Sequence, residues 1–140
     1  MDLDGHLKAL PHGPDFRFID ELKSLEPGQS AQGVYHITGD EAFLRGHFPG
    51  RPMVPGVILA EAIAQLAGVA AQSDDKHPAL DDLRLTALSK VKILGAAVPG
   101  QSLAISARVV GRMGNLIQAE GEIRVDNALI CTAVVALSGS

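Results

Sequence analysis

The sequence predicts an α+β protein in which a long antiparallel β-sheet wraps around one central apolar helix. Three observations lead to this fold class: a single strong helix pattern at 57–71, stretches in which apolar and polar residues alternate, and turn signals between them. The chain has 140 residues, 46% of them hydrophobic, and neither a linker nor a shift in composition divides it. We therefore expect a single domain over residues 1–140, with one core.

Two strands are expected ahead of the helix. Residues 16–25 and 31–37 flank Glu26-Pro27-Gly28-Gln29, a turn signal of the kind that joins neighbouring strands. A loop rich in proline and glycine follows, and Pro55-Gly56 at its end marks the entry to the helix. From 57 to 71 all residues except Glu61 and Gln65 are Val, Ile, Leu, Ala or Gly, so the helix should be buried on almost all sides.

Three further strands follow from alternation and turn chemistry. In residues 102–110 and 117–125, alternate positions are mostly apolar and should face the core. These core positions are Leu103, Ile105, Ala107 and Val109 in the first stretch, and Ile117, Ala119, Ile123 and Val125 in the second. Asp126-Asn127 is a hairpin signal before a last strand at 129–137. A sheet wrapped around one helix is the simplest way to bury all of these faces.

The loop at 46–56 places one histidine, His47, among three prolines and several glycines. Proline fixes φ and glycine permits conformations that other residues avoid, so we expect this loop to hold His47 in one place. The free N–H groups of the first helical turn, beginning at Gly56, carry the positive end of the helix dipole and should point towards the loop. They form a candidate oxyanion hole.

Glu61 and Gln65 are four residues apart and share one stripe of the apolar helix. Burial disfavours an ionised carboxyl, so Glu61 could donate a proton, and histidine suits the opposite role of base. This pair fits the elimination or addition of water. Taken alone, His47 could be structural and Glu61 could be a surface residue that stabilises the helix dipole, but the apolar neighbours of Glu61 favour function. For Gln65 we favour hydrogen bonds to backbone inside the core over a catalytic role.

The run from His47 to Gly68, with Glu61 fourteen positions after His47, resembles the signature of FabZ-type (3R)-hydroxyacyl-acyl carrier protein dehydratases of the hotdog-fold superfamily. Leu10-Pro11-His12 upstream and Val98-Pro99-Gly100 downstream extend the resemblance to about residues 10–138. It implies a hotdog fold and dehydration of (3R)-hydroxyacyl to trans-2-enoyl thioesters on acyl carrier protein in fatty acid biosynthesis, without a cofactor.

The resemblance also implies roles for individual residues. His47 would be the base, Glu61 would protonate the departing hydroxyl, and the N–H of Gly56 would polarise the thioester carbonyl. The substrate-binding candidates are Phe48, Pro49, Val57 and Gln65. In this family the acid and base of one site come from two subunits, so the implied assembly is a homodimer, with a trimer of dimers as a further step that the sequence does not fix.

Several alternatives stay open. Isomerising FabA-type relatives usually carry Asp at the position of Glu61, which favours plain dehydration here. Gly13-Pro14-Asp15 replaces the family's usual Arg-Tyr-Pro, which leaves the identity of the carrier open. The candidates for a basic docking patch are Arg45, Arg51, Lys90, Lys92, Arg108 and Arg112. The alternative functions are a hotdog acyl thioesterase, a dehydratase dedicated to a polyketide or polyene pathway, and a non-catalytic acyl-binding subunit, against which the presence of both His47 and Glu61 argues.

Composition argues against several other classes of protein. A net charge of −4 does not favour nucleic acid as a partner. Cys131 is the single cysteine and His6, His12, His36 and His77 are dispersed, so we expect neither an internal disulfide nor a metal. Residues 1–8 lack the apolar core of a secretion signal, and Pro55, Glu61 and Gln65 interrupt the longest apolar stretch. We expect a cytoplasmic protein without a membrane span.

Overall fold

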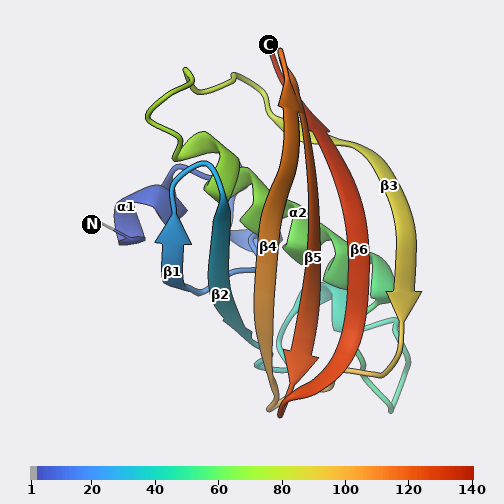
Figure 1. Ribbon diagram of the computed structural model, residues 1–140. Helices are drawn as coiled ribbons and strands as arrows, with labels where there is room; N and C mark the ends of the chain where they lie inside the picture. Colours follow the sequence, from blue (N-terminus) through green and yellow to red (C-terminus); the bar gives the residue numbers. More distant parts are fainter. Residues whose placement is uncertain (1–2) are drawn as a thin grey trace.

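One curved sheet and the helix that it surrounds make up most of the computed structural model, which describes residues 3–140 (Figure 1). The predictions for the domain range and for the N-terminal segment therefore reach beyond the described residues at Met1 and Asp2. All neighbouring strands are antiparallel and follow the order β1-β2-β4-β5-β6-β3. The strands are β1 (Glu21–Glu26), β2 (Ser30–His36), β3 (Arg84–Ile93), β4 (Ser102–Met113), β5 (Leu116–Val125) and β6 (Ala128–Ser138). The predicted α+β class is confirmed.

The central helix is α2 (Gly56–Gln72), and it packs against β4, β5, β6 and β2. Its side chains are buried almost without interruption from Leu59 onwards, as the apolar sequence predicts. The helix ends at Ser73, whose N–H donates to the carbonyl of Val69 and whose hydroxyl donates to the carbonyl of Ala70. The core therefore lies between one helix and the concave face of one sheet.

Gly121 of β5 lets the helix approach the sheet closely. A Cβ at this position would lie 2.6 Å from the Cγ2 of Ile63 on α2 and 2.5 Å from the carbonyl oxygen of Ser106 on β4. Neither distance is tolerable for a real side chain, so glycine is required where the helix crosses β5. The predicted alternation on both sides of this point is confirmed, with Ile105 and Ile123 each about fully buried.

The expected strand at 16–25 is wrong in its first five residues. Pro14–Phe16 form a 3-10 helix, and regular strand pairing begins only at Glu21. The cause is Gln65 of α2, whose side chain hydrogen-bonds the backbone of Phe16 and Phe18 and so replaces the partners that a strand would supply. Two other short helices, α1 (Leu3–Lys8) and the 3-10 helix at Ala42–Leu44, were not expected.

Strand β3 was also not predicted as a regular element. Its register with β6 shifts between Leu85 and Ala87 and again between Ser89 and Lys92, so the two-residue period that marks a strand in sequence is broken. The strand lies at one edge of the sheet and exposes Leu88, Val91 and Ile93 by 41%, 38% and 48%. At the opposite edge α1 packs against β1 (Figure 1). The β3 edge therefore exposes three large apolar side chains next to Lys90 and Lys92, and within residues 3–140 it pairs with no strand other than β6.

Candidate active site

His47 lies in a loop that is closed by its own backbone hydrogen bonds. The N–H of His47 donates to Leu44 at 3.2 Å, its carbonyl accepts from the N–H of Met53 at 2.8 Å, and Phe48 and Arg51 exchange a pair of bonds. The N–H of Val54 donates to Ala97 at 2.8 Å, which ties the loop to the segment before β4. These bonds give the proline-rich loop the definite shape that its composition predicts.

The position of the proton on the His47 ring follows from its neighbours. Nδ1 lies 3.1 Å from the carbonyl oxygen of Met53. A carbonyl can only accept, so Nδ1 carries the hydrogen and Nε2 of the neutral ring keeps a free lone pair. The ring of Phe48 stacks on the imidazole with centroids 4.2 Å apart. His47 is thus held with Nε2 as the ring nitrogen that could accept a proton.

The start of α2 presents unpaired backbone donors. Pro55 is the N-cap residue, and its carbonyl accepts from the N–H groups of Ile58 and Leu59. Within the described part of the chain, the N–H of Gly56 has no acceptor. A Cβ on Gly56 would lie 3.2 Å from the side chain of Ile93, so glycine also suits the tight packing here. This N–H is available to a negatively charged oxygen, as an oxyanion hole requires.

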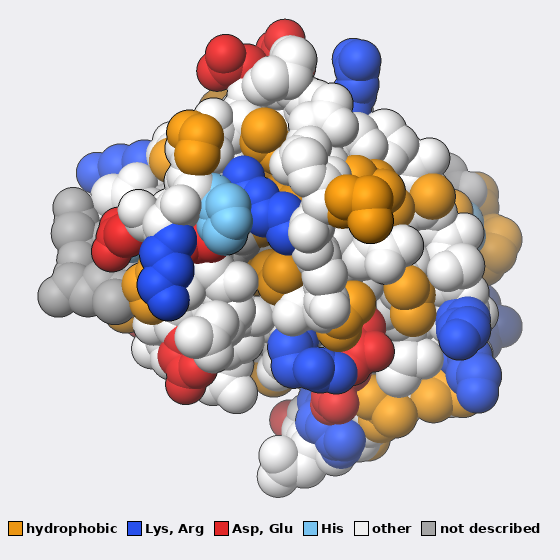
Figure 2. Space-filling view, turned by 45° about the horizontal axis from the view of Figure 1, so that its top comes forward, with side chains coloured by type: hydrophobic (Ala, Val, Ile, Leu, Met, Phe, Trp, Pro, Cys, Tyr) orange, Lys and Arg blue, Asp and Glu red, His pale blue; other side chains and the backbone are white. Residues whose placement is uncertain are grey.

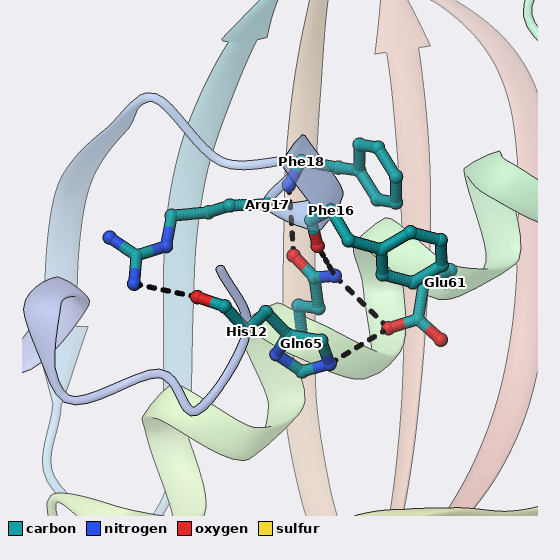
Figure 3. Close-up of polar contacts among 6 residues, drawn as sticks. All are labelled: His12, Phe16, Arg17, Phe18, Glu61 and Gln65. Atoms are coloured by element: carbon teal, nitrogen blue, oxygen red, sulfur yellow. Dashed lines mark hydrogen bonds and ion pairs between the residues drawn. The ribbon is translucent and has the colours of Figure 1, made fainter. Parts of the chain in front are cut away.

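Glu61 has two polar partners, one on its own helix and one from a segment far away in the sequence. Its Oε2 accepts from the Nε2 of Gln65 at 3.1 Å and lies 3.5 Å from the Nε2 of His12 (Figure 3). The side chain of Glu61 is 18% exposed, so it is neither a surface carboxylate nor a fully buried one. The immediate neighbours of Glu61 along the helix are apolar, as the sequence indicates, but the segment before β1 also brings His12 against the helix.

Gln65 is almost fully buried, with 1% of its surface exposed. Its Oε1 accepts from the N–H of Phe18 at 2.9 Å, and its Nε2 donates both to the carbonyl of Phe16 at 2.8 Å and to Glu61 (Figure 3). The expected hydrogen bonds to backbone inside the core are confirmed. Because Oε1 is taken by an N–H, the amide nitrogen must face Glu61.

The two halves of the predicted site do not meet within one chain. His47 with Phe48 and Pro49 belongs to the loop, whereas Glu61 and Gln65 face the segment that carries His12. Across residues 3–140, no hydrogen bond joins His47 to Glu61. Sequence reasoning placed His12 among the dispersed histidines, because His12 and Glu61 lie 49 positions apart and their proximity is hidden. The single signal was the place of His12 in the Leu10-Pro11-His12 motif.

A cavity of about 570 Å³ opens beside Glu61. Its wall includes Ala64, Gln65 and Gly68 of α2, together with apolar side chains from the neighbouring segments. These are Leu10, Leu83, Leu85 and Leu137. Such a cavity suits an apolar chain that ends near the carboxyl group of Glu61. A larger hollow of about 980 Å³ crosses the outer face of the sheet, but neither His47 nor Glu61 lines it.

Glu41 and Tyr35 brace the segment that leads from β2 into the His47 loop. Glu41 accepts hydrogen bonds from the Tyr35 hydroxyl at 2.7 Å and from the N–H groups of Thr38 and Gly39. Burial would raise the pKa of Glu41, but these bonds outweigh it and lower the pKa to about 2. Burial, and next the bond to Glu41, raise the pKa of Tyr35. Glu41 is therefore an ionised anchor rather than a proton donor at neutral pH.

The basic candidates do not form one continuous patch. Arg108 pairs with Glu120, and Arg112 donates to the carbonyl of Pro78. On the face shown in Figure 2, lysine and arginine side chains lie in separate groups with acidic and apolar side chains between them. Arg45 and Arg51 are exposed on either side of His47 in the sequence.

Among residues 3–140, no group of three or more His, Cys, Asp and Glu side chains is arranged to hold a metal ion. None of the helices in this range is long and apolar enough to cross a membrane.

A curved antiparallel sheet closed around one long apolar helix defines the hotdog fold, and solved structures agree. The dehydratase heterocomplex ApeI:P from Xenorhabdus doucetiae superposes with a TM-score of 0.81 at 18% identity, over 100% of this chain and 91% of that one. Zebra fish thioesterase superfamily member 2 gives a TM-score of 0.74 at 15% identity, over 100% and 99%. Dehydratases and thioesterases thus share the fold, which alone does not separate the two activities.

Sequence comparison is more specific. Residues 10–134 match the family described as FabA-like domain, and the chain belongs to this family. A relative from Syntrophomonas wolfei, named 3-hydroxyacyl-[acyl-carrier-protein] dehydratase FabZ, is 34% identical over 89% of this chain and 86% of its own length. A relative of the same name from Thermoanaerobacter is 32% identical over 95% of this chain and 93% of its own.

Proposed function

We propose that this protein is a hydro-lyase that converts (3R)-hydroxyacyl thioesters on acyl carrier protein into trans-2-enoyl thioesters in fatty acid biosynthesis. The observation that carries the proposal is that the chain holds two complementary groups. One is a histidine whose Nε2 is free, and the other is a carboxyl group whose Oε2 accepts from an amide. The first group can take a proton and the second can give one. The names of the sequence relatives support the same substrate and reaction.

The proposed reaction begins at the carbon next to the thioester carbonyl. Nε2 of His47 removes a proton from this carbon, and negative charge develops on the carbonyl oxygen, where the N–H of Gly56 stabilises it. Preorganised donors of this kind contribute most where charge develops in the transition state.

Departure of the hydroxyl completes the elimination. Because the Gln65 amide nitrogen can only donate, Oε2 of Glu61 accepts from it, and Oε1 is the oxygen left to carry the proton that the reaction transfers. Glu61 gives this proton to the β-hydroxyl, the carbon–oxygen bond breaks, and water leaves as the carbon–carbon double bond forms. The proton now on His47 must return to Glu61 before the next turnover.

We further propose that each site is completed by a second copy of the chain. His47 and Glu61 do not meet within one chain, and the exposed apolar edge of β3 offers a surface for pairing two sheets. The loop of one subunit would then face Glu61 of the other, and a monomer would be inactive. Phe48, Pro49 and Val57 would line the mouth, and the acyl chain would enter the cavity beside Glu61. A cytoplasmic location fits a carrier-bound substrate.

The test is an absorbance assay of enoyl thioester formation, run on 3-hydroxybutyryl and longer 3-hydroxyacyl chains carried by acyl carrier protein or coenzyme A. His47→Ala and Glu61→Gln should each lower kcat by about 100-fold or more, the usual contribution of a general base or acid. His36→Ala, which changes an exposed histidine bonded to Ser102, serves as the control and should keep wild-type turnover. Release of free thiol would instead indicate a thioesterase, and silence from a folded dimer would indicate an acyl-binding subunit.

A further inference from the structure

We propose that His12 is a positioning residue for Glu61, and that its Nε2–H, together with the Gln65 amide, holds the Glu61 carboxyl so that its proton lies on Oε1. This inference rests on the proposed function, because it gives the acid of that reaction a second donor. It also concerns a residue that lies far from the helix in the sequence and outside the loop that carries the base.

The geometry around the His12 ring fixes the position of its proton. Nδ1 is buried and has no hydrogen-bond partner among residues 3–140, whereas Nε2 lies 3.5 Å from Oε2 of Glu61. Nδ1 has no partner in either tautomer, so Nε2 decides between them. It faces Oε2 of Glu61, an oxygen that already accepts from Gln65, and hydrogen on Nε2 lets His12 donate to the same oxygen. At 3.5 Å this contact is not a hydrogen bond in the structure described, so the proposal requires the imidazole and the carboxyl group to move a few tenths of an ångström closer when substrate binds.

The segment that carries His12 is anchored independently of Glu61. Arg17 donates from Nη2 to the carbonyl of His12 at 3.0 Å and to that of Leu10 at 3.3 Å. The His12 ring stacks with Phe16 at a centroid distance of 6.1 Å, and the carbonyl of Phe16 accepts from Gln65 (Figure 3). A closed set of contacts therefore joins residues 10–18 to α2, and this set places the imidazole against the carboxyl.

Two donors on one oxygen have a chemical consequence. With both Gln65 and His12 facing Oε2, this oxygen is a poor site for the acidic proton, and Oε1 is left to meet the substrate. Without His12, only Gln65 would orient the carboxyl group. Its two oxygens would then share the proton more evenly, and fewer molecules would have the proton where the β-hydroxyl needs it.

The kinetic test compares two substitutions of His12. His12→Met keeps apolar bulk and removes the donor, and kcat should fall by about tenfold with KM little changed, as for the loss of an outer partner of an active-site group. His12→Gln places an amide N–H near the former Nε2 and should restore kcat to within about threefold of wild type. His77→Met, which breaks another histidine–carboxylate pair at Asp74 in the turn after α2, should change neither constant. Equal loss in both His12 variants, or a loss confined to KM, would overturn the proposal.

A structural role is separated from a positioning role by combining His12→Met with Glu61→Gln and measuring single turnovers. If His12 acts through Glu61, adding His12→Met to Glu61→Gln lowers the rate no further, whereas damage to the fold would lower it again. Nitrogen NMR of the His12 ring gives a reading that needs no activity. It should show hydrogen on Nε2 and a shift of that signal in Glu61→Gln. Hydrogen on Nδ1 would refute the inference about His12, even if the protein proves to be a dehydratase. If the hydrogen is on Nε2 but the protein is inactive on every acyl thioester, only the proposed function is refuted.

Discussion

At the scale of single residues, backbone groups decide what the candidate catalytic side chains can do. The carbonyl of Met53 directs the hydrogen of His47 to Nδ1, and the N–H of Phe18 turns the amide of Gln65 towards Glu61. Neither partner can reverse its role, because a carbonyl only accepts and an N–H only donates. His47 and Gln65 are thus oriented by main-chain groups that a side-chain substitution elsewhere would not remove.

Glu41 provides a test of residue-scale electrostatics. Its pKa in the folded protein, about 2, lies below the ordinary value of 4.5, so its bonds stabilise the fold above about pH 4.5 and are lost as the pH falls towards 2. Glu41→Gln should therefore lower the free energy of unfolding by about 1–2 kcal/mol at pH 7 and much less at pH 3. Urea unfolding at both pH values measures this difference. An equal effect at the two pH values would mean that the charge of Glu41 does not contribute.

Residue-scale reasoning from the sequence succeeded where the signal was local. The shaped loop around His47 and the backbone bonds of Gln65 follow from proline, glycine and a lone amide in an apolar helix. The partner of Glu61 could not be predicted in this way. His12 approaches Glu61 only because Arg17 and Gln65 fold residues 10–18 over α2, and no periodicity reports such a tertiary contact.

At the scale of elements, the crossing of α2 and the sheet depends on Gly121. Gly121→Ala would place a Cβ against Ile63 and the carbonyl of Ser106, and should lower the free energy of unfolding by about 1–3 kcal/mol through overpacking. Gly111→Ala on β4 is the matched control. The nearest atom to its Cβ would be the Oε1 of Gln118 at 3.9 Å, so a change within about 0.5 kcal/mol is expected. Urea unfolding of both variants measures the contrast, and equal stability would refute the close crossing.

The elements that the sequence predicts well are those with an unbroken period. Helix α2 and strand β5 keep their apolar spacing over nine or more residues, and their bounds lie within one residue of the predictions. Strand β4 keeps its spacing up to Val109, where its register with β5 shifts, and it runs three residues beyond the predicted end. Strand β3 has two register shifts, so its apolar residues fall out of phase. The first strand begins late because a helix side chain satisfies the backbone of Phe16 and Phe18, which is a long-range effect.

At the scale of the whole molecule, an incomplete site and an unpaired apolar edge point to the same assembly. Among residues 3–140, no hydrogen bond joins His47 to Glu61, and β3 leaves Leu88, Val91 and Ile93 exposed at the end of the sheet. Pairing two copies along this edge would cover the apolar side chains and continue the sheet. The central claim is therefore that two chains supply the base and the acid of each dehydratase site.

Complementation between two inactive variants tests this claim most directly. Chains carrying His47→Ala and chains carrying Glu61→Gln are unfolded together, refolded, and assayed for dehydration, with mixed dimers verified by native mass spectrometry. Half of the dimers should be mixed, and each mixed dimer should hold one complete site, so activity should return to about a quarter of the wild-type value. Mixed dimers that are no more active than the separate variants would contradict the account, because acid and base would then not be shared between chains.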